Sequence, residues 1–480
     1  LKFTTRNSLH ACALCCAHAR KMKICIVWGV TLAAAVAVEQ CDKGTLETDA
    51  ALGESTSGEN AAEEESARLK AIFRPEPEAD GGYPIDSESS AFLELLSAEA
   101  PAEAAKMRAQ LRQNPLHFQA RLTLCSSLEM HSPLSRPQAQ RFEDFVFCYR
   151  RVMEAFTFAE GLLNDANAPD AQRKPFLQTQ AWAARLAGDR IVTFSEAQEH
   201  RLAEGIDYIR RGLKDGLGCT PDPTECIQAS ANLMLAHHLK EAPESELQAA
   251  LSEVKQIPGV TIAWPDPLSI DVQLPGIRKQ AIWNPADIRW LSDVAAQWHT
   301  IRDELDQYIK KRDEAAKDMT WEHQPRSSYL AGTAEWNSVD LYMSGEWKTN
   351  CLEHFPKTCA MLQGRPELDP TNFQWPASVL SRPGGASKLR VPALMANIYQ
   401  AVPGARIRKH FGTHSRLVAS MGLKVPPGAV LHVGNQQQTW EEGKWTLFDD
   451  AFMHEVLNNS TEPRYVLAVA MLHPECCATC

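Results

Sequence analysis

The chain has 480 residues, 44% of them apolar, with 49 Lys and Arg against 60 Asp and Glu. This length exceeds an ordinary single domain and the apolar content suffices for packed cores, so we expect two or three domains. The formal net charge of −11 argues against a nucleic-acid partner, because phosphate binders need a clustered excess of Lys and Arg. Fourteen cysteines, many dispersed singly, favour an oxidising compartment.

The first predicted element is a targeting segment within residues 1–40. Arg20, Lys21 and Lys23 precede a 15-residue apolar run at 24–38, which contains an Ala-x-Ala cleavage pattern at 35–37. This arrangement predicts a secretory signal peptide. A membrane-spanning helix usually needs about 20 apolar residues, so a signal anchor in the membrane is the alternative. Either interpretation places the protein in the secretory pathway.

An acidic stretch, residues 41–88, comes next. Between residues 39 and 66, nine acidic side chains accompany a single lysine and few large apolar side chains. Such a composition cannot bury a core. We therefore expect a disordered linker.

Residues 89–255 are expected to be an α-helical region. Segments at 90–115 and 226–242 have helical apolar spacing and are separated by Pro, Gly and Asn. A third segment predicts a helix that ends at Gly216. Its apolar stripe consists of Leu202, Ile206, Ile209 and Leu213. The region shows no clean 34-residue period, so a stacked helical repeat stays open as an alternative.

A change of pattern marks the C-terminal part. Residues 257–285 are rich in proline and form the candidate boundary, and one long helix is expected around 295–319. Beyond about residue 338 the apolar runs are short, partly alternating and bounded by Gly, Pro and Asn, which predicts a largely antiparallel sandwich or barrel. Residues 439–448 read as a hairpin that turns at 441–444.

Two histidines of this β region, His410 and His454, are the candidate metal ligands. In a jelly roll, strands distant in sequence can be neighbours, so both imidazoles can point into one barrel mouth. Non-haem Fe(II) oxygenases use two His and one carboxylate. The usual carboxylate position is Gly412 here; Asp449 and Asp450 are alternatives, although shaping the turn before His454 is their simpler role. Two unrelated structural histidines are the competing interpretation.

An arginine near the end of the chain adds to this pattern. Arg464 begins the apolar run 464–472, where a buried guanidinium would have little structural use. A guanidinium inside a barrel can hold the distal end of a dicarboxylate through two parallel hydrogen bonds. The alternative is an ordinary strand-end arginine that reaches solvent.

Five segments together resemble the aspartyl/asparaginyl β-hydroxylases, 2-oxoglutarate-dependent dioxygenases of the endoplasmic reticulum. They are WHTIRDE at 298–304, CLEHFPKTCAML at 351–362, PGARIRKHFGTHSRL at 403–417, TWEEGKWTLFDDAFMHEV at 439–456 and RYVLAVAMLHPE at 464–475. The resemblance follows the family's motif order. It implies a double-stranded β-helix (jelly-roll) dioxygenase domain at 274–476, and thus an α+β multidomain protein with the helical region in front.

The resemblance implies roles for the metal and co-substrate residues. His410 and His454 match the two iron ligands, and the family has glycine where other dioxygenases carry the carboxylate, as at Gly412. Arg464 matches the arginine that grips the far carboxylate of 2-oxoglutarate. Tyr399 stands where a serine usually helps to bind that co-substrate.

The resemblance is weaker on the substrate side. Val418 and Ser420 stand where the family has an arginine and a histidine, whereas Arg416 is kept as the expected contact for a substrate carboxylate. Cys351 and Cys359 match a family cysteine pair. A disulfide between them would stabilise the fold by roughly 2 to 3 kcal/mol on the chain-entropy model.

The implied activity is an Fe(II)- and 2-oxoglutarate-dependent hydroxylation of the β-carbon of Asp or Asn in protein substrates such as epidermal-growth-factor-like domains, in the endoplasmic reticulum lumen or at its membrane. Two alternatives stay open. One is a hydroxylase of the same fold that acts on a lipid or another substrate; the other is a catalytically degenerate luminal binding scaffold. Val418 and Ser420 favour these alternatives, and the intact His410, His454 and Arg464 favour an enzyme.

Overall fold

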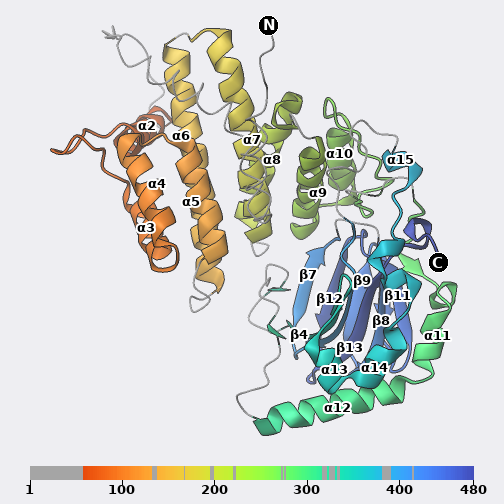
Figure 1. The fold of residues 1–480 in the computed structure, drawn as a ribbon. Helices are drawn as coiled ribbons and strands as arrows, with labels where there is room; N and C mark the ends of the chain where they lie inside the picture. Colours follow the sequence, from red (N-terminus) through yellow and green to blue (C-terminus); the bar gives the residue numbers. More distant parts are fainter. Residues whose placement is uncertain are drawn as a thin grey trace, which may run out of the picture. The chain divides into compact units, whose positions relative to one another are not determined.

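The computed structural model describes residues 58–131, 138–166, 168–194, 199–219, 223–271, 274, 277–315, 322–323, 330–331, 336–380, 391–412 and 416–480. The predicted targeting segment lies outside these residues. Two compact units are present, one formed by Leu1–Pro133 with Phe147–Ala183 and the other by Leu134–Val146 with Ala184–Cys480 (Figure 1). Because this division falls inside the helical region, the domain limits expected from the sequence stay predictions. No described helix is long and apolar enough to cross a membrane.

The described part of the first unit is helical. It contains α2 (Gly58–Phe73), α3 (Ser87–Glu99), α4 (Pro101–Gln113), α5 (Phe118–His131) and parts of α6 (Gln138–Asp165) and α7 (Asp170–Phe194). Asp86 caps α3 by accepting a hydrogen bond from the Ser89 backbone N–H at 3.0 Å. A disulfide joins Cys125 of α5 to Cys148 of α6.

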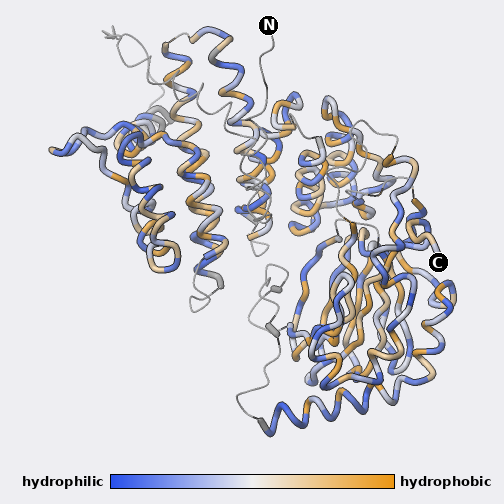
Figure 2. Tube along the Cα trace, in the orientation of Figure 1, coloured by the Kyte–Doolittle hydropathy of each residue, from blue (hydrophilic) through white to orange (hydrophobic). Residues whose placement is uncertain are grey.

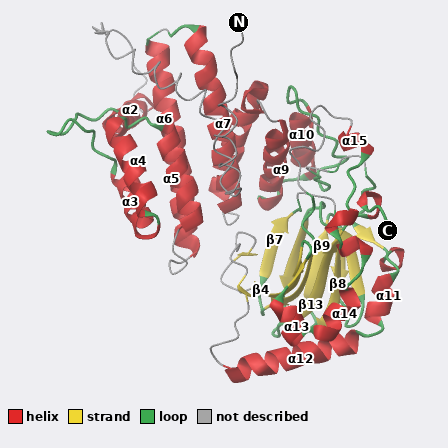
Figure 3. Ribbon diagram, viewed as in Figure 1, coloured by secondary structure: helices red, strands yellow, loops and turns green. Residues whose placement is uncertain are grey.

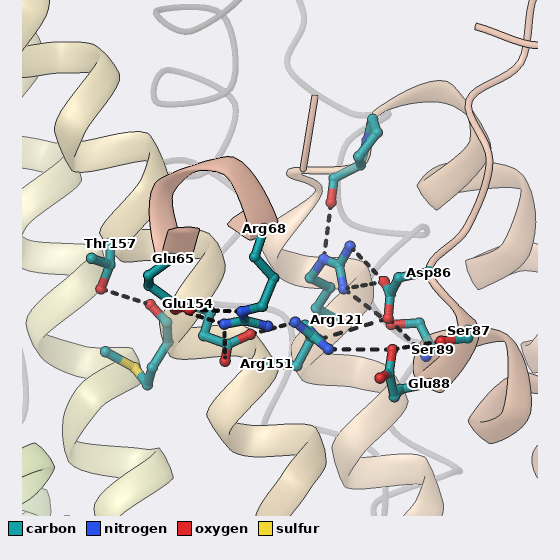
Figure 4. Close-up of polar contacts among 12 residues, drawn as sticks. Glu65, Arg68, Asp86, Ser87, Glu88, Ser89, Arg121, Arg151, Glu154 and Thr157 are labelled. Carbon is teal, nitrogen blue, oxygen red and sulfur yellow. Dashed lines mark hydrogen bonds and ion pairs between the residues drawn. The ribbon is translucent and has the colours of Figure 1, made fainter. Parts of the chain in front are cut away.

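Asp86 is also the centre of a charged network (Figure 4). Its carboxylate lies 3.2 Å from Arg121 of α5 and 3.7 Å from Arg151 of α6, and all three side chains are at most 5% exposed. Arg121 also donates to the Pro115 carbonyl at 2.9 Å. The network therefore fastens the start of α3 to α5 and α6.

Helix α2 lies inside the segment that composition predicts to be disordered, so that expectation is wrong for Gly58–Phe73. Its sequence is rich in Ala and Glu, which are strong helix formers. Leu69 and Phe73 are buried, and Arg68 pairs with Glu154 of α6 at 2.9 Å. A few apolar residues at the end of an acidic segment thus suffice to dock it.

Further helices belong to the second unit, namely α8 (Glu199–Leu213), the 3₁₀ turn η3 (Lys214–Cys219), α9 (Pro223–Leu239) and α10 (Glu244–Lys255). The four residues of the predicted stripe on α8 are all buried. The chain reverses after Leu213, and Gly216 has φ 67°. A Cβ at Gly216 would lie 2.7 Å from the Pro258 carbonyl oxygen, so only glycine fits this turn.

The second unit also contains two antiparallel sheets (Figure 3), which confirm the predicted α+β class with a C-terminal jelly roll. The larger sheet has the order β1-β11-β8-β13-β6-β4-β2, with β5 on β4, and the smaller has β10-β9-β12-β7-β3. The strands are β1 (Ile282–Trp283), β2 (Glu322–His323), β3 (Leu330–Ala331), β4 (Trp336–Met343), β5 (Glu346–Trp347), β6 (Met395–Ala401), β7 (Arg406–His410), β8 (Leu417–Lys424), β9 (Ala429–Val433), β10 (Gln436–Thr439), β11 (Trp445–Asp449), β12 (His454–Asn458) and β13 (Arg464–Met471).

The expected hairpin at 439–448 is wrong. Strand β10 pairs with β9, and β11 pairs with β8 and β1 in the other sheet. The turn at 441–444 exists, since the Lys444 N–H donates to the Glu441 carbonyl at 3.1 Å, but it carries the chain from one sheet to the other. A turn inside a hairpin and a turn between two sheets use the same kinds of residue. The sequence at 441–444 therefore did not distinguish one from the other.

The strands of the sheets are rich in hydrophobic residues (Figure 2), and both faces of the larger sheet are packed against apolar side chains. One face packs against α11 (Trp290–Ala295), α12 (Trp298–Ala315), α13 (Thr349–His354) and α14 (Pro356–Leu362); it includes Leu417, Ala419, Leu467 and Val469. A disulfide between Cys351 and Cys359, the pair that the resemblance implies, joins α13 to α14. The opposite face meets the smaller sheet in the barrel core, defined as Ala281, Ala429, Leu431, Val433, Trp440, Phe448, Phe452 and Val466.

Candidate functional site

Strands β7 and β12 bring the two candidate histidines together. The strand register places His454 directly opposite His410, with the ring centroids 4.0 Å apart and the ring planes at 54°. The pairing shifts register between His454 and Val456, so a local irregularity follows the histidine. Phe448 of the barrel core lies 5.1 Å from the His454 ring.

Each imidazole is oriented by a backbone carbonyl two residues before it. The His410 Nδ1–H donates to the Arg408 carbonyl at 2.8 Å, and the His454 Nδ1–H donates to the Phe452 carbonyl at 2.7 Å. Since a carbonyl can only accept, Nδ1 carries the proton and Nε2 carries the lone pair. This is the arrangement of a histidine that binds metal through Nε2.

Burial keeps both imidazoles neutral. It lowers the pKa of His410 to about 3, with a further contribution from the neighbouring His454. It also lowers the pKa of His454, although Asp450 opposes that shift. A metal ligand must be deprotonated at the coordinating nitrogen, and both rings meet this requirement at neutral pH.

A carboxylate accompanies the histidine pair. Asp450 Oδ1 lies 3.6 Å from His454 Nε2, and Arg416 Nε donates to Asp450 Oδ2 at 2.7 Å. Burial opposes ionisation of Asp450, but the charge and the hydrogen bond of Arg416 outweigh it and hold the pKa below its ordinary value. A Cβ at Gly412 would lie 2.1 Å from Asp450 Oδ2. The Asp450 carboxylate therefore occupies the space that a side chain at position 412 would need.

The adjacent aspartate has a different role. Asp449 Oδ1 accepts a hydrogen bond from the Ala451 N–H at 3.0 Å, which shapes the turn between β11 and β12. Burial raises the pKa of Asp449 to about 7. Of the two candidates for the third carboxylate, Asp450 is thus the one beside the histidine pair.

Arg464 is a buried cation. It begins β13, is 2% exposed and forms no ion pair with any described residue. Its guanidinium carbon lies 4.3 Å from the centre of the Trp440 ring, and its Nε has no hydrogen-bond partner among the described residues. Burial lowers its pKa to about 9, which still leaves it charged at neutral pH. An uncompensated buried charge is costly, so this position suits an anionic ligand.

Trp440 is a site residue that the sequence reasoning missed. Its Nε1–H donates to the Ser420 hydroxyl at 3.0 Å, and its ring covers Arg464. Ser420, which departs from the family pattern, therefore anchors the aromatic wall beside the arginine. A buried Trp needs a hydrogen-bond partner for its indole N–H. This requirement is the feature of the sequence from which a role for Trp440 could have been inferred.

Tyr399 and Val418 also adjoin the barrel core. Tyr399 on β6 lies opposite Val466 of β13, two residues from Arg464. Its hydroxyl accepts from Asn397 Nδ2 at 3.1 Å, and burial raises its pKa to about 12, so it stays a neutral donor. Val418 is an apolar side chain at the position where the family has its second arginine.

Two nearby basic residues do not replace that arginine. Arg406 pairs with Glu455 at 3.2 Å. Arg408 donates through a terminal nitrogen to the Thr193 carbonyl at 2.7 Å. Both guanidinium groups thus have contacts of their own away from Val418.

The residue next to each histidine packs against the helices of the second unit. Phe411 and Met453 belong to the apolar cluster formed mainly by α8, α9 and α10. The segment before residue 272 adds backbone bonds, because the Ile270 N–H donates to the Ala451 carbonyl at 2.9 Å and the Met453 N–H donates to the Leu268 carbonyl at 2.8 Å. The histidine pair therefore rests on helices as well as on the sheets.

The donor set fits a metal with few protein ligands. In the described part of the chain, no group of three or more His, Cys, Asp and Glu side chains is arranged to hold a metal ion. Two neutral, carbonyl-oriented imidazoles with one ionised carboxylate beside them are present instead. Such a set suits a two-histidine Fe(II) site, which leaves coordination positions for other ligands.

Comparison with known proteins identifies the domain. The family model described as "Aspartyl/Asparaginyl beta-hydroxylase" matches residues 295–474. The human aspartyl/asparaginyl β-hydroxylase is 24% identical over 282 residues, which is 58% of this chain and 32% of that protein. Residues 295–474 thus form a domain that matches the aspartyl/asparaginyl β-hydroxylase family. The resemblance inferred from the sequence is thereby confirmed.

Other matches of this chain are shorter or more distant. Mouse aspartate β-hydroxylase domain-containing protein 1 is 43% identical over 77 residues, 15% of this chain and 21% of that protein. A Pseudomonas putida prolyl-4-hydroxylase structure, 16% identical, covers 41% of this chain and 91% of its own at a TM-score of 0.22, so the architecture rests on the strand pairings instead. The chain matches about a third of the length of the full human relative.

Proposed function

We propose that this chain is an Fe(II)- and 2-oxoglutarate-dependent dioxygenase. The observation that carries the proposal is the histidine pair, His410 and His454, combined with a buried cation, Arg464, that forms no ion pair within the part of the chain that the structure describes. In this proposal the two histidines hold Fe(II). The bound metal and co-substrate would supply the oxidising power for hydroxylation of a C–H bond.

The protein's own residues would bind, orient and exclude water. Arg464 would pair with the far carboxylate of 2-oxoglutarate, with Trp440 as the wall on one side and the Tyr399 hydroxyl as a neutral donor. The apolar barrel core would keep water away from the reacting centre. The carbonyl bonds to both Nδ1 atoms would fix the ligand geometry before the metal arrives.

The proposed substrate is the β-carbon of an Asp or Asn side chain in a protein of the secretory pathway, such as an epidermal-growth-factor-like domain. The names of the human and mouse relatives support this choice. The proposed location is the endoplasmic reticulum lumen or its membrane. Four disulfides among the described residues support an oxidising compartment; they join Cys125–Cys148, Cys219–Cys226, Cys351–Cys359 and Cys477–Cys480.

Two other functions have an observation in their favour. Apolar Val418 beside the barrel core favours a hydroxylase of the same fold that acts on a lipid or another less polar substrate. The same change, together with Ser420, favours a degenerate scaffold. The scaffold does not account for Arg464, whose burial without an ion pair among the described residues has a cost that a bound dicarboxylate would offset. A same-fold hydroxylase would use Arg464 in the proposed way, so only its substrate would differ.

Succinate release tests the proposal. The protein would be incubated with Fe(II), 2-oxoglutarate and O₂, with and without an epidermal-growth-factor-like peptide, beside a His454→Ala control. Peptide-stimulated succinate together with one added oxygen on Asp or Asn is the expected result. Succinate formation that the peptide does not stimulate would indicate that the substrate is a lipid or another molecule. Folded wild-type protein that binds no iron and forms no succinate would favour the scaffold.

A further inference from the structure

Arg416 and Asp450 form a contact that the proposed reaction does not explain. Arg416 Nε donates to Asp450 Oδ2 at 2.7 Å, and Arg416 Nη1 donates to the Ala393 carbonyl. The side chains of Arg416 and Asp450 are 18% and 8% exposed. Two donors of the guanidinium are thus committed inside the protein.

The backbone ties the same residues together. The Gly412 N–H donates to the Asp450 carbonyl at 2.6 Å, and the Asp450 N–H donates to the Arg416 carbonyl at 3.0 Å. Asp450 is therefore held through its carboxylate, its carbonyl and its N–H by the segment that follows His410. This segment and the one that leads into His454 are consequently fixed to each other at Asp450.

The Asp450 carboxylate lies in the space beside Gly412. A Cβ at Gly412 would lie 2.1 Å from Asp450 Oδ2 and 2.6 Å from its Cγ, both far inside van der Waals contact. Arg416 approaches Oδ2, and Oδ1 lies 3.6 Å from His454 Nε2. The absence of a side chain at position 412 and the guanidinium at position 416 together direct the carboxylate towards the histidine pair.

We propose that Arg416 is a positioning residue for the metal site: its guanidinium holds the Asp450 carboxylate beside His454, in the space that Gly412 leaves open. This inference rests on the proposed function and refines it. It replaces the expectation that Arg416 chiefly contacts a substrate carboxylate. Substrate recognition then depends on other residues, while Arg416, Gly412 and Asp450 act as one unit.

Metal affinity and peptide kinetics distinguish the two roles. Fe(II) dissociation constants would be measured without O₂, and KM and kcat for the peptide at saturating Fe(II), in wild type, Arg416→Gln, Arg416→Lys and Gly412→Ala. Arg406→Gln is the matched control, because Arg406 also pairs with a carboxylate, that of Glu455, but does not contact Asp450. Folding would be followed by thermal unfolding.

We expect Arg416→Gln and Gly412→Ala to weaken Fe(II) binding by about tenfold to a hundredfold, the range typical of residues that orient a metal site. Arg416→Lys should recover part of the loss, the peptide KM at saturating Fe(II) should stay within about threefold, and Arg406→Gln should bind Fe(II) as wild type does. Gly412→Ala would displace the Asp450 carboxylate while leaving Arg416 unchanged. Its Fe(II) affinity therefore tests whether the position of Asp450 matters if Arg416→Gln does not fold.

Two outcomes would overturn the inference in different ways. Wild-type Fe(II) affinity in Arg416→Gln with a peptide KM raised tenfold or more would make Arg416 a substrate contact and leave the dioxygenase function standing. Wild-type protein that binds no Fe(II) would overturn the proposed function and this inference together.

Discussion

The indole ring of Trp440 lies over the guanidinium of Arg464, with 4.3 Å between the ring centroid and the guanidinium carbon. The ring offers the cation a partial partner that carries no formal charge. The carboxylate of a ligand can therefore still find a full positive charge inside the barrel, and this relationship leads to the first prediction.

Replacing Arg464 with Gln should raise the KM for 2-oxoglutarate by about tenfold to a hundredfold, since a charge-assisted contact contributes about 1.5–3 kcal/mol. The kcat at saturating co-substrate should fall less. Initial rates of succinate formation at varied 2-oxoglutarate measure both. The Arg406→Gln variant, which removes a partly exposed guanidinium from the same domain, should keep the wild-type KM. An unaltered KM in Arg464→Gln would remove this residue from the co-substrate site.

Metal-free protein should lose stability on acidification because of its buried histidines. The pKa of His410 is about 3 in the folded chain, below the value of about 6.5 expected when unfolded. Between these values the unfolded chain binds a proton that the folded chain does not. The free energy of unfolding should therefore fall by up to about 1.4 kcal/mol per pH unit for this group as pH drops below about 6.5.

Urea unfolding at pH 7 and pH 5 measures this pH dependence. His410→Gln should show a shallower loss than wild type. Part of the slope should remain, because burial also lowers the pKa of His454 and of His473, the latter to about 4. Equal slopes in wild type and variant would show that His410 titrates normally in the folded protein.

The charged network of the first unit should be sensitive to its central carboxylate. Asp86→Ala leaves Arg121 and Arg151, both about 95% buried, without that partner and removes the cap of α3. We expect a loss of about 3–5 kcal/mol in the free energy of unfolding, measured by urea titration. Glu94→Ala, which breaks an exposed pair with Arg108, should cost at most about 1 kcal/mol. Similar losses in both variants would mean that the network contributes little.

A glycosylation sequon overlaps the end of β12. The sequence Asn-Asn-Ser-Thr makes Asn458 and Asn459 both formal acceptors. Asn458 is fully buried, and its Nδ2 donates to the carbonyls of Ala401 and Glu462, each at 2.9 Å, whereas Asn459 is exposed. If the protein is expressed through the secretory pathway of a eukaryotic cell, Asn459→Gln should abolish a mass shift that a glycosidase removes. A glycan that survives this substitution would contradict the assignment.

The sequence predicted the features that depend on residue type and periodicity. The helical stripe on α8 and the antiparallel character of the C-terminal part follow from apolar spacing, and the structure confirms both. The family resemblance paired His410 with His454, and the strand register places them opposite each other. The roles of these residues stay predictions.

Features that depend on cross-strand placement were not predictable. The Arg416–Asp450 contact joins residues 34 positions apart, and the Trp440–Ser420 bond crosses from the connection after β10 to β8. Neither has a local signature. Helix α2 was missed because net charge outweighed the few apolar residues that dock it.

Phe411 and Met453 pack among the helices. The smallest part of the chain that can fold on its own therefore begins earlier than the family match. The family match starts at residue 295, yet the neighbours of both histidines are buried by α8, α9 and α10 and by the backbone bonds at Leu268 and Ile270. A fragment that starts at residue 274 would expose this apolar surface to water. A soluble catalytic fragment should therefore begin no later than Ala184, the start of the long segment of the second unit.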